Sequence, residues 1–159
     1  MKTKNLFILI ALLIGMSNCK KEEFLPQSIN FFSDEQLSNV IVEYEEIVSY
    51  DSLNYIFTIE DEAWERIDKE IKQAQPANSF NLFIALDDER IYKANYIPMY
   101  YSFTITDIIA FFLEKPNYIH IKLGYPPGTI PESIFTGEDL RNDIRLIEQL
   151  KKDNKLIKN

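Results

Sequence analysis

The chain has 159 residues, of which 46% are hydrophobic and 13% aromatic, so it is long and apolar enough to form one folded domain. Its formal net charge of -8 at pH 7 repels phosphate backbones, so we expect no nucleic-acid partner. One cysteine, one histidine and four glycines predict no internal disulfide, no metal site and no cofactor held by a glycine-rich phosphate loop.

The first residues have the pattern of a secretory signal. Lys2 and Lys4 precede the apolar run LFILIALLIG at 6–15, which is shorter than the roughly 20 residues that span a bilayer. The alternative is a buried N-terminal helix, but such a helix rarely combines lysine-flanked continuous apolarity with an abrupt change to CKKEE. We therefore predict that residues 1–18 are a signal peptide.

Cys19 follows this segment directly. Its position resembles the cleavage site of bacterial lipoproteins, in which the cysteine becomes the first mature residue and carries a diacylglyceryl group. Met16 and Ser17 fit that pattern, whereas Asn18 departs from the preferred Gly, Ala or Ser. KKEE at 20–23 resembles the export signal of surface lipoproteins in the Bacteroidota. The resemblance implies lipidation of Cys19 by fatty-acyl chains such as palmitate, and anchoring to the outer membrane facing the surface or the periplasm.

The segment after the cysteine lacks any periodic pattern. Residues 19–38 mix charges, Pro26 and polar side chains, which predicts a flexible tether behind the lipidated cysteine. Phe31 and Phe32 could either dock on the domain or lie in this linker. The remaining residues, 39–159, are predicted to form a single domain.

The domain begins with two predicted strands and a helix. VIVEYEEIV at 40–48 is strand-like, and LNYIFTI at 53–59 alternates between apolar and polar faces. The apolar spacing then becomes helical and continues to Pro76, which predicts a helix over about 60–74. Its stripe places Trp64 in the core rather than on a ligand-binding surface.

More strands and a second helix follow. Strands are predicted at 80–86 and 90–97, joined by the turn DDE, and at 102–106 and 118–123. The run IIAFFL at 108–113 is buried but of uncertain type. A helix is predicted from Thr136 and Asp139 onward, with the apolar stripe Leu140, Ile144, Ile147 and Leu150. The order predicts an α+β fold, with a mainly antiparallel sheet and two helices on one face.

Two stretches of the domain, YIFTIEDEAWERI and FIALDDERIYKANYI, resemble the periplasmic head subdomain of the SecD translocase component. That family has a strand, a helix and a hairpin with Ala-x-x-Leu-Asp-Gly and a later Ala-Pro-x-Ile. Residues in comparable places are Ala85, Leu86, Asp87, Ala94 and Ile97, whereas Asp88 and Asn95 replace the glycine and the proline. The family's later glycine-rich element is missing. The resemblance covers about half of the chain, implies a ferredoxin-like fold and transfers no catalytic residue.

Candidates for chemistry are few. His120 lies opposite the isoleucines of its strand, which predicts an exposed or rim histidine. Asp87, Asp88 and Glu89 are explained by a hairpin turn without a metal. Carboxylate pairs for glycoside hydrolysis could come from Glu43, Glu45, Glu46 and Glu60–Glu62, but a small domain lacks the usual deep cleft. We therefore predict no catalytic residues.

Tyrosines gather in one stretch, NYIPMYYS at 95–102. Tyr96, Met99, Tyr100 and Tyr101 are the candidate binding residues, because tyrosine gives a large contact area at low entropic cost. The alternative, which we weigh more heavily, is that these rings cover the sheet and the rim of the core. The expected function is a lipid-anchored envelope protein that binds a protein or glycan partner or serves in assembly. The alternative is a small envelope hydrolase acting on polysaccharide or peptidoglycan.

Overall fold

The computed structural model describes residues 27–74, 80–98 and 101–157. The strands are β1 (Ile29–Phe32), β2 (Val40–Val42), β3 (Ile47–Asp51), β4 (Ile56–Ile59), β5 (Phe80–Leu86), β6 (Glu89–Tyr96), β7 (Ile105–Glu114), β8 (Tyr118–Tyr125) and β9 (Leu156–Ile157). The α-helices are α2 (Asp61–Ala74) and α3 (Ile144–Lys152), and the short 3-10 helices are η1 (Tyr44–Glu46) and η2 (Glu132–Ile134). Within these ranges no helix has the length and apolarity needed to cross a membrane.

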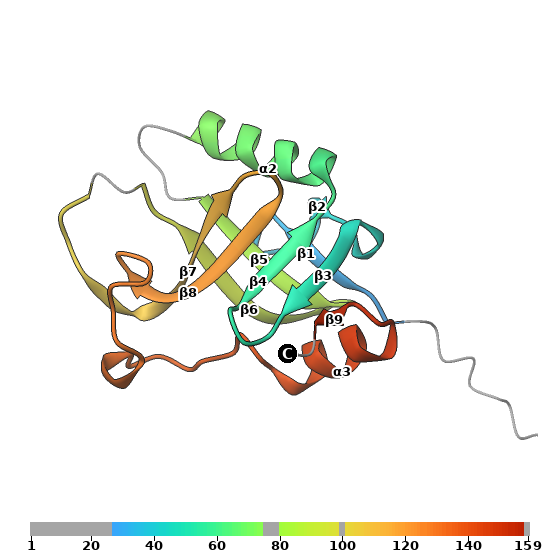
Figure 1. The fold of residues 1–159 in the computed structure, drawn as a ribbon. Coiled ribbons are helices and arrows are strands. Elements are labelled where there is room, and N and C mark those ends of the chain that lie inside the picture. Colours follow the sequence, from blue (N-terminus) through green and yellow to red (C-terminus); the bar gives the residue numbers. More distant parts are fainter. Residues whose placement is uncertain (1–26, 75–79, 99–100, 158–159) are drawn as a thin grey trace, which may run out of the picture.

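All nine strands belong to one sheet in the order β2-β1-β5-β6-β7-β8-β4-β3-β9 (Figure 1). Neighbouring strands are antiparallel except for the pairs β6–β7 and β3–β9, which are parallel. The predicted α+β class with a mainly antiparallel sheet is thus confirmed. The finer expectation of a ferredoxin-like order is not met, because four strands precede the first helix instead of one.

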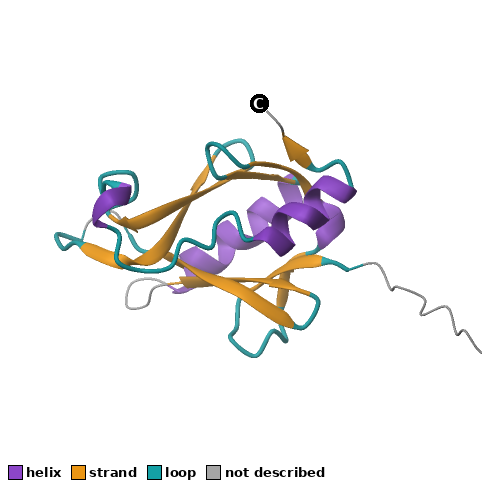
Figure 2. Cartoon of the chain, turned by 90° about the horizontal axis from the view of Figure 1, so that it is seen from below, coloured by secondary structure: helices purple, strands orange, loops and turns teal. Residues whose placement is uncertain are grey.

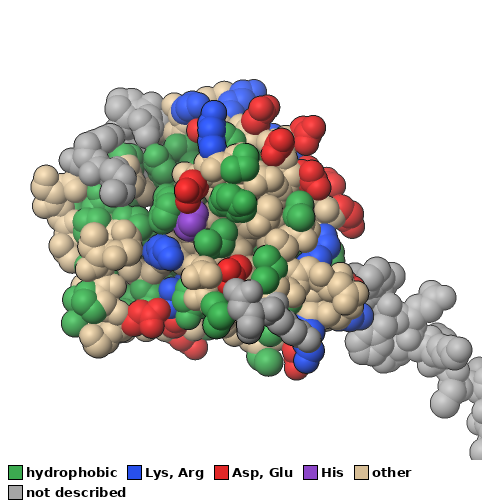
Figure 3. Space-filling model, in the orientation of Figure 1, with side chains coloured by type: hydrophobic (Ala, Val, Ile, Leu, Met, Phe, Trp, Pro, Cys, Tyr) green, Lys and Arg blue, Asp and Glu red, His purple; other side chains and the backbone are tan. Residues whose placement is uncertain are grey.

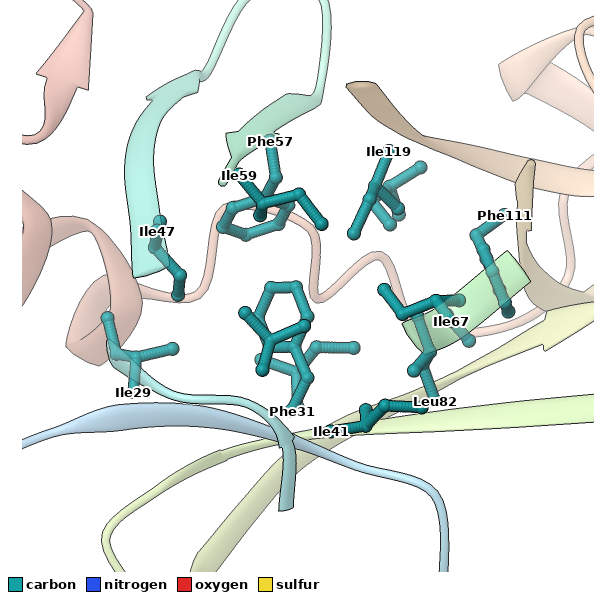
Figure 4. Packing of buried hydrophobic residues seen from close by; sticks show 14 of the residues in the cluster. Ile29, Phe31, Ile41, Ile47, Phe57, Ile59, Ile67, Leu82, Phe111 and Ile119 are labelled. Atoms are coloured by element: carbon teal, nitrogen blue, oxygen red, sulfur yellow. The ribbon is translucent and has the colours of Figure 1, made fainter. Parts of the chain in front are cut away.

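The sheet bends until its two halves face each other, as Figure 2 shows. Phe31 of β1 packs edge-to-face against Phe57 of β4, with ring centroids 5.0 Å apart, although four strands separate β1 from β4 in the sheet. Figure 4 shows these rings between the two halves, with Ile119 of β8 on the same side as Phe57. The core therefore lies on the concave face of one sheet.

Both helices close this core from the concave side (Figure 2). Trp64, Ile67 and Ile71 of α2 are buried in the same cluster as Leu146 and Leu150 of α3. The predicted bounds of α2, about 60–74, agree with the structure to within one residue. Trp64 is a core residue, as expected. Burying one such side chain contributes roughly 1.5–3 kcal/mol, so α2 is held mainly by its apolar stripe.

The predicted tether is wrong where it includes β1. Ile29 and Phe31 are fully buried, and β1 pairs with β5 on one side and β2 on the other. The folded domain therefore begins well before residue 39. A strand of four residues among polar neighbours carries too little periodicity to be seen locally, and its partners come from elsewhere in the chain.

Two other boundaries differ from the prediction. The uncertain run at 108–113 is the middle of β7. The second helix begins at Ile144, because Asp143 caps it by accepting a hydrogen bond from the Arg145 amide. Thr136 and Asp139, the expected helix start, instead lie in a loop over residues 136–142, where Asp139 binds the Arg141 guanidinium.

Candidate functional site

A cavity forms where β6 and β7 separate. The two strands pair in parallel only at Ala94↔Ile109 and Asn95↔Ala110. At this point the Asn95 side-chain amide donates to the Ile109 carbonyl over 2.9 Å. β6 then ends at Tyr96, whereas β7 continues alongside β8, and a cavity of about 490 Å³ lies between these strands and α2.

The walls of the cavity are mainly apolar and aromatic. The helix α2, the end of β6, the end of β7 and the loop after β8 all contribute to them. The lining residues are Trp64, Asp68, Ile71, Tyr96, Ile97, Phe112, Leu113, Lys115 and Pro127. In the view of Figure 3, the chain's single histidine lies beside hydrophobic side chains and an acidic one, and it stacks on Phe112 of the cavity wall.

Two charged residues lie at the cavity, in different situations. The Lys115 ammonium sits over the Trp64 ring, 5.6 Å from its centroid, in a cation–π contact. Within the described chain this ammonium has no carboxylate partner. Asp68, in contrast, is ion-paired with Lys72 one turn further along α2. The uncompensated charge at the cavity is therefore positive.

The indole of Trp64 adds an unusual polar group. Trp64 is 8% exposed, and its Nε1–H is buried without a hydrogen-bond acceptor among the described residues. Buried donors are nearly always paired with protein or ordered water, so an unpaired one calls for an explanation. Trp64 and Lys115 together give this wall two donors and no acceptor of their own.

The predicted tyrosine segment is only partly at the cavity. Tyr96 lines it and packs on Phe111 with ring centroids 5.8 Å apart. Tyr101 is 37% exposed and lies beside Phe103, at 5.3 Å between centroids. Met99 and Tyr100 fall outside the described residues, as does the predicted lipidation site, Cys19.

A buried tyrosine hydroxyl holds the backbone of this stretch at two positions, Pro98 and Tyr101. The Tyr125 hydroxyl lies 2.8 Å from the Pro98 carbonyl and 3.1 Å from the Tyr101 carbonyl. Its ring also packs against Phe103, at 5.3 Å between centroids. The aromatic surface of Tyr101 and Phe103 is thereby held against Tyr125.

The histidine is a rim residue, more buried than exposed. The His120 side chain is 13% exposed and stacks on Phe112 with ring centroids 4.5 Å apart. Its Nε2 lies 2.6 Å from the Glu114 carboxylate. Burial lowers the pKa of His120, because it disfavours the imidazolium more than Glu114 favours it. The ring is thus neutral near pH 7 and forms part of an apolar surface.

The acidic candidates have structural roles. Asp87 has a φ of 51° in the β5–β6 turn, and it exchanges hydrogen bonds with the Ser28 backbone. Glu46 in η1 forms an ion pair with Arg66. In the described ranges, no three His, Cys, Asp or Glu side chains are grouped so as to hold a metal ion.

Sequence reasoning missed a buried arginine. The Arg141 side chain is 3% exposed, and its guanidinium binds Asp139 and Glu132, each at 2.7 Å. It also stacks on the Tyr55 ring at 3.6 Å. The Tyr50 hydroxyl in turn donates to the Arg141 carbonyl over 2.7 Å. This cluster fastens the long loop after β8 to the β3–β4 end of the sheet.

No family model matches the chain, and no curated protein or solved structure is significantly similar to it. The features of the chain that bear on its function are the chemistry of the cavity and the pattern of residues 1–24.

Proposed function

We propose that the chain is a lipoprotein anchored to the bacterial outer membrane through Cys19, and that its domain is a binding module whose site is the cavity. The observation that carries the binding role is the apolar cavity between α2 and the separating strands β6 and β7. Its volume of about 490 Å³ lies in the range of small-molecule sites, and its walls are held by core elements. The anchor is supported by the pattern of residues 1–24.

The composition of the walls favours binding over hydrolysis. Glycosidases need two carboxylates on either side of the scissile bond. Asp68 is the one carboxylate among the described lining residues, and it is ion-paired with Lys72. A glycan is also a poor fit, because Ile71, Ile97 and Leu113 offer no hydrogen bonds to sugar hydroxyls. The cavity suits an apolar group.

The anchor is tested by Cys19→Ala in the producing cell. The variant should leave the membrane fraction and lose labelling by a fatty-acid probe, because the thiol is the acceptor of the lipid. Lys21→Ala, which keeps the thiol, should retain the label. Unchanged membrane association with an intact N-terminus at Met1 would contradict the anchor.

The binding site is tested with a neutral apolar dye, N-phenyl-1-naphthylamine, on the mature chain carrying Cys19→Ser. Trp64 is the single tryptophan and lines the cavity, so energy transfer from it reports bound dye, and a cavity variant shows whether the dye occupies the cavity. We expect saturable binding that Ile97→Phe weakens by about tenfold, because the larger side chain fills the cavity. Ile144→Phe is the matched control, since Ile144 is 64% exposed on α3. Absence of saturable transfer would refute the site.

A further inference from the structure

We infer that the natural ligand of the cavity is a single-chain amphiphile with an anionic head group, whose apolar chain fills the cavity and whose head is held by Lys115. This inference rests on the binding role proposed above and specifies its ligand class.

The charge at the cavity mouth selects the sign of the head group. Lys115 is exposed, and its ammonium has no carboxylate partner in the described chain. The charge of Asp68 is already compensated by Lys72. On a chain whose formal net charge is -8, an uncompensated cation beside an apolar cavity is a local exception that favours an anion. A charge-assisted hydrogen bond to that anion is the strong kind.

The indole supports the same assignment. Trp64 lines the cavity, and its buried Nε1–H lacks an acceptor among the described residues. The Lys115 ammonium is placed 5.6 Å from the centroid of that ring. The indole N–H is buried and the lysine is exposed, so the ammonium is the donor that a head group meets first, and a carboxylate, sulfonate or phosphate head supplies only acceptors. A cationic head is repelled here, and a neutral hydroxyl forms only a weaker, neutral hydrogen bond.

The rest of the cavity selects the body of the ligand. Ile71, Ile97 and Leu113 offer aliphatic contacts, and Phe112 adds an aromatic one. These walls contribute no polar side-chain atoms, so a flexible hydrocarbon chain loses no hydrogen bonds on entering. Transfer of each methylene from water is favourable by about 0.8 kcal/mol. An alkyl chain of medium length with one anionic end satisfies both parts of the site.

The experiment compares three ligands that share a ten-carbon chain: decanoate, 1-decanol and decylamine. Each is titrated at about pH 7.5, where a carboxylic acid is ionised, into the mature Cys19→Ser chain, and Trp64 fluorescence and displacement of the neutral dye are followed. We expect decanoate to bind about tenfold more tightly than 1-decanol, and decylamine to bind most weakly.

Paired variants test whether Lys115 is responsible. Lys115→Met keeps the length of the side chain and removes its charge, so it should abolish the preference for decanoate over 1-decanol. Lys93→Met makes the same change at an exposed position on β6 that does not line the cavity, and it should leave the preference intact. Trp64→Phe, followed by dye displacement, should weaken decanoate more than 1-decanol, because a hydrogen bond from the indole to a charged carboxylate is stronger than one to a neutral hydroxyl.

The outcomes separate the ligand class from the site. Equal binding of decanoate and 1-decanol, tighter binding of decylamine, or a preference that survives in Lys115→Met overturns the anionic head group while the cavity stands. Failure of all three ligands and of the dye overturns the proposed function as well.

Phosphatidylglycerol vesicles identify the source of the ligand. Co-sedimentation that decanoate reverses would mean that the cavity takes one chain of a two-chain membrane lipid, which overturns the single-chain ligand, whereas its absence supports a free amphiphile.

Discussion

The cations Arg141 and Lys115 differ in how many partners the described chain gives them. The Arg141 guanidinium is buried, binds two carboxylates and stacks on Tyr55. Lys115 is exposed, has no carboxylate partner in the described chain and lies over the face of Trp64, an indole whose own Nε1–H has no acceptor there. The contacts of Arg141 hold the loop after β8 against the sheet. At Lys115 and Trp64, the ammonium has no carboxylate partner and the indole N–H has no acceptor among the described residues.

The contrast indicates where the domain is built for stability and where it is built for a ligand. A buried polar group without a partner costs roughly 1–3 kcal/mol, so a fold retains one mainly where another molecule supplies the partner. At the Arg141 end the Nε and Nη2 donors of the guanidinium are matched by Asp139 and Glu132 from within the chain. At the cavity end the chain supplies apolar walls and donors. The two ends are therefore expected to respond differently to mutation.

The largest effect is expected from Trp64→Ala. Removing this core side chain should lower the free energy of unfolding by about 3–5 kcal/mol, because it leaves a void beside Ile67 and Ile71. Trp64→Phe removes the unpaired Nε1–H while keeping an aromatic ring, so it should cost less than about 1.5 kcal/mol. Urea denaturation measures both. Equal losses in the two variants would show that the indole donor is used within the fold.

Arg141→Met should come next, with a loss of about 3 kcal/mol. The apolar replacement abandons the hydrogen bonds to Asp139 and Glu132, and these carboxylates are partly solvated, which limits the cost. Lys115→Met should change the free energy of unfolding by less than about 0.5 kcal/mol, since an exposed lysine without an ion pair contributes little. A comparable loss in the two variants, measured by the same denaturation, would remove the distinction between the two cations.

The smallest expected effect is a difference in pH dependence. The pKa of His120, next to the cavity wall, is lowered by burial, so the unfolded chain takes up a proton there before the folded one does. Stability at this end should therefore decrease as pH falls through about 6.5. The hydrogen bond from Arg141 lowers the pKa of Asp139, so that end loses stability only below about pH 4.

The measurement compares urea midpoints of the native chain and His120→Gln. Between about pH 7.5 and 5.5 the native chain should lose more stability than the variant, because glutamine does not titrate. Glu114 and Lys122 face position 120 in both proteins, so the difference between the two proteins reports on the imidazole. A steeper loss in the variant would mean that the folded state stabilises the imidazolium.

The two ends also differ in how far the sequence predicts them. The period of α2 is local, so its bounds and the burial of Trp64 follow from spacing alone. The cavity joins residues far apart in the chain, such as Trp64, Tyr96 and Lys115, and it depends on a two-residue parallel pairing that no local pattern encodes. The tyrosine-rich stretch did locate one wall, through Tyr96.

The missed features share a physical cause. β1 is defined by its pairing with β5 and β2 rather than by its own four residues. Arg141 looks like any surface arginine until the bent sheet brings Tyr55 beneath it at 3.6 Å. Both depend on contacts between segments separated widely in sequence, whereas propensity and period report only on neighbours.

The hydrogen bonds between Ser28 and Asp87 have a consequence for orientation. They hold the start of the folded domain at the Leu86 end of β5, whereas the cavity lies toward the Phe80 end, where β5 pairs with Tyr96 (Figure 1). Seven residues of strand at about 3.3 Å each separate these ends by roughly 20 Å. A lipid on the preceding residues would thus be attached at the Leu86 end of β5, away from the cavity. The ligand would then enter the domain at the end away from its anchor.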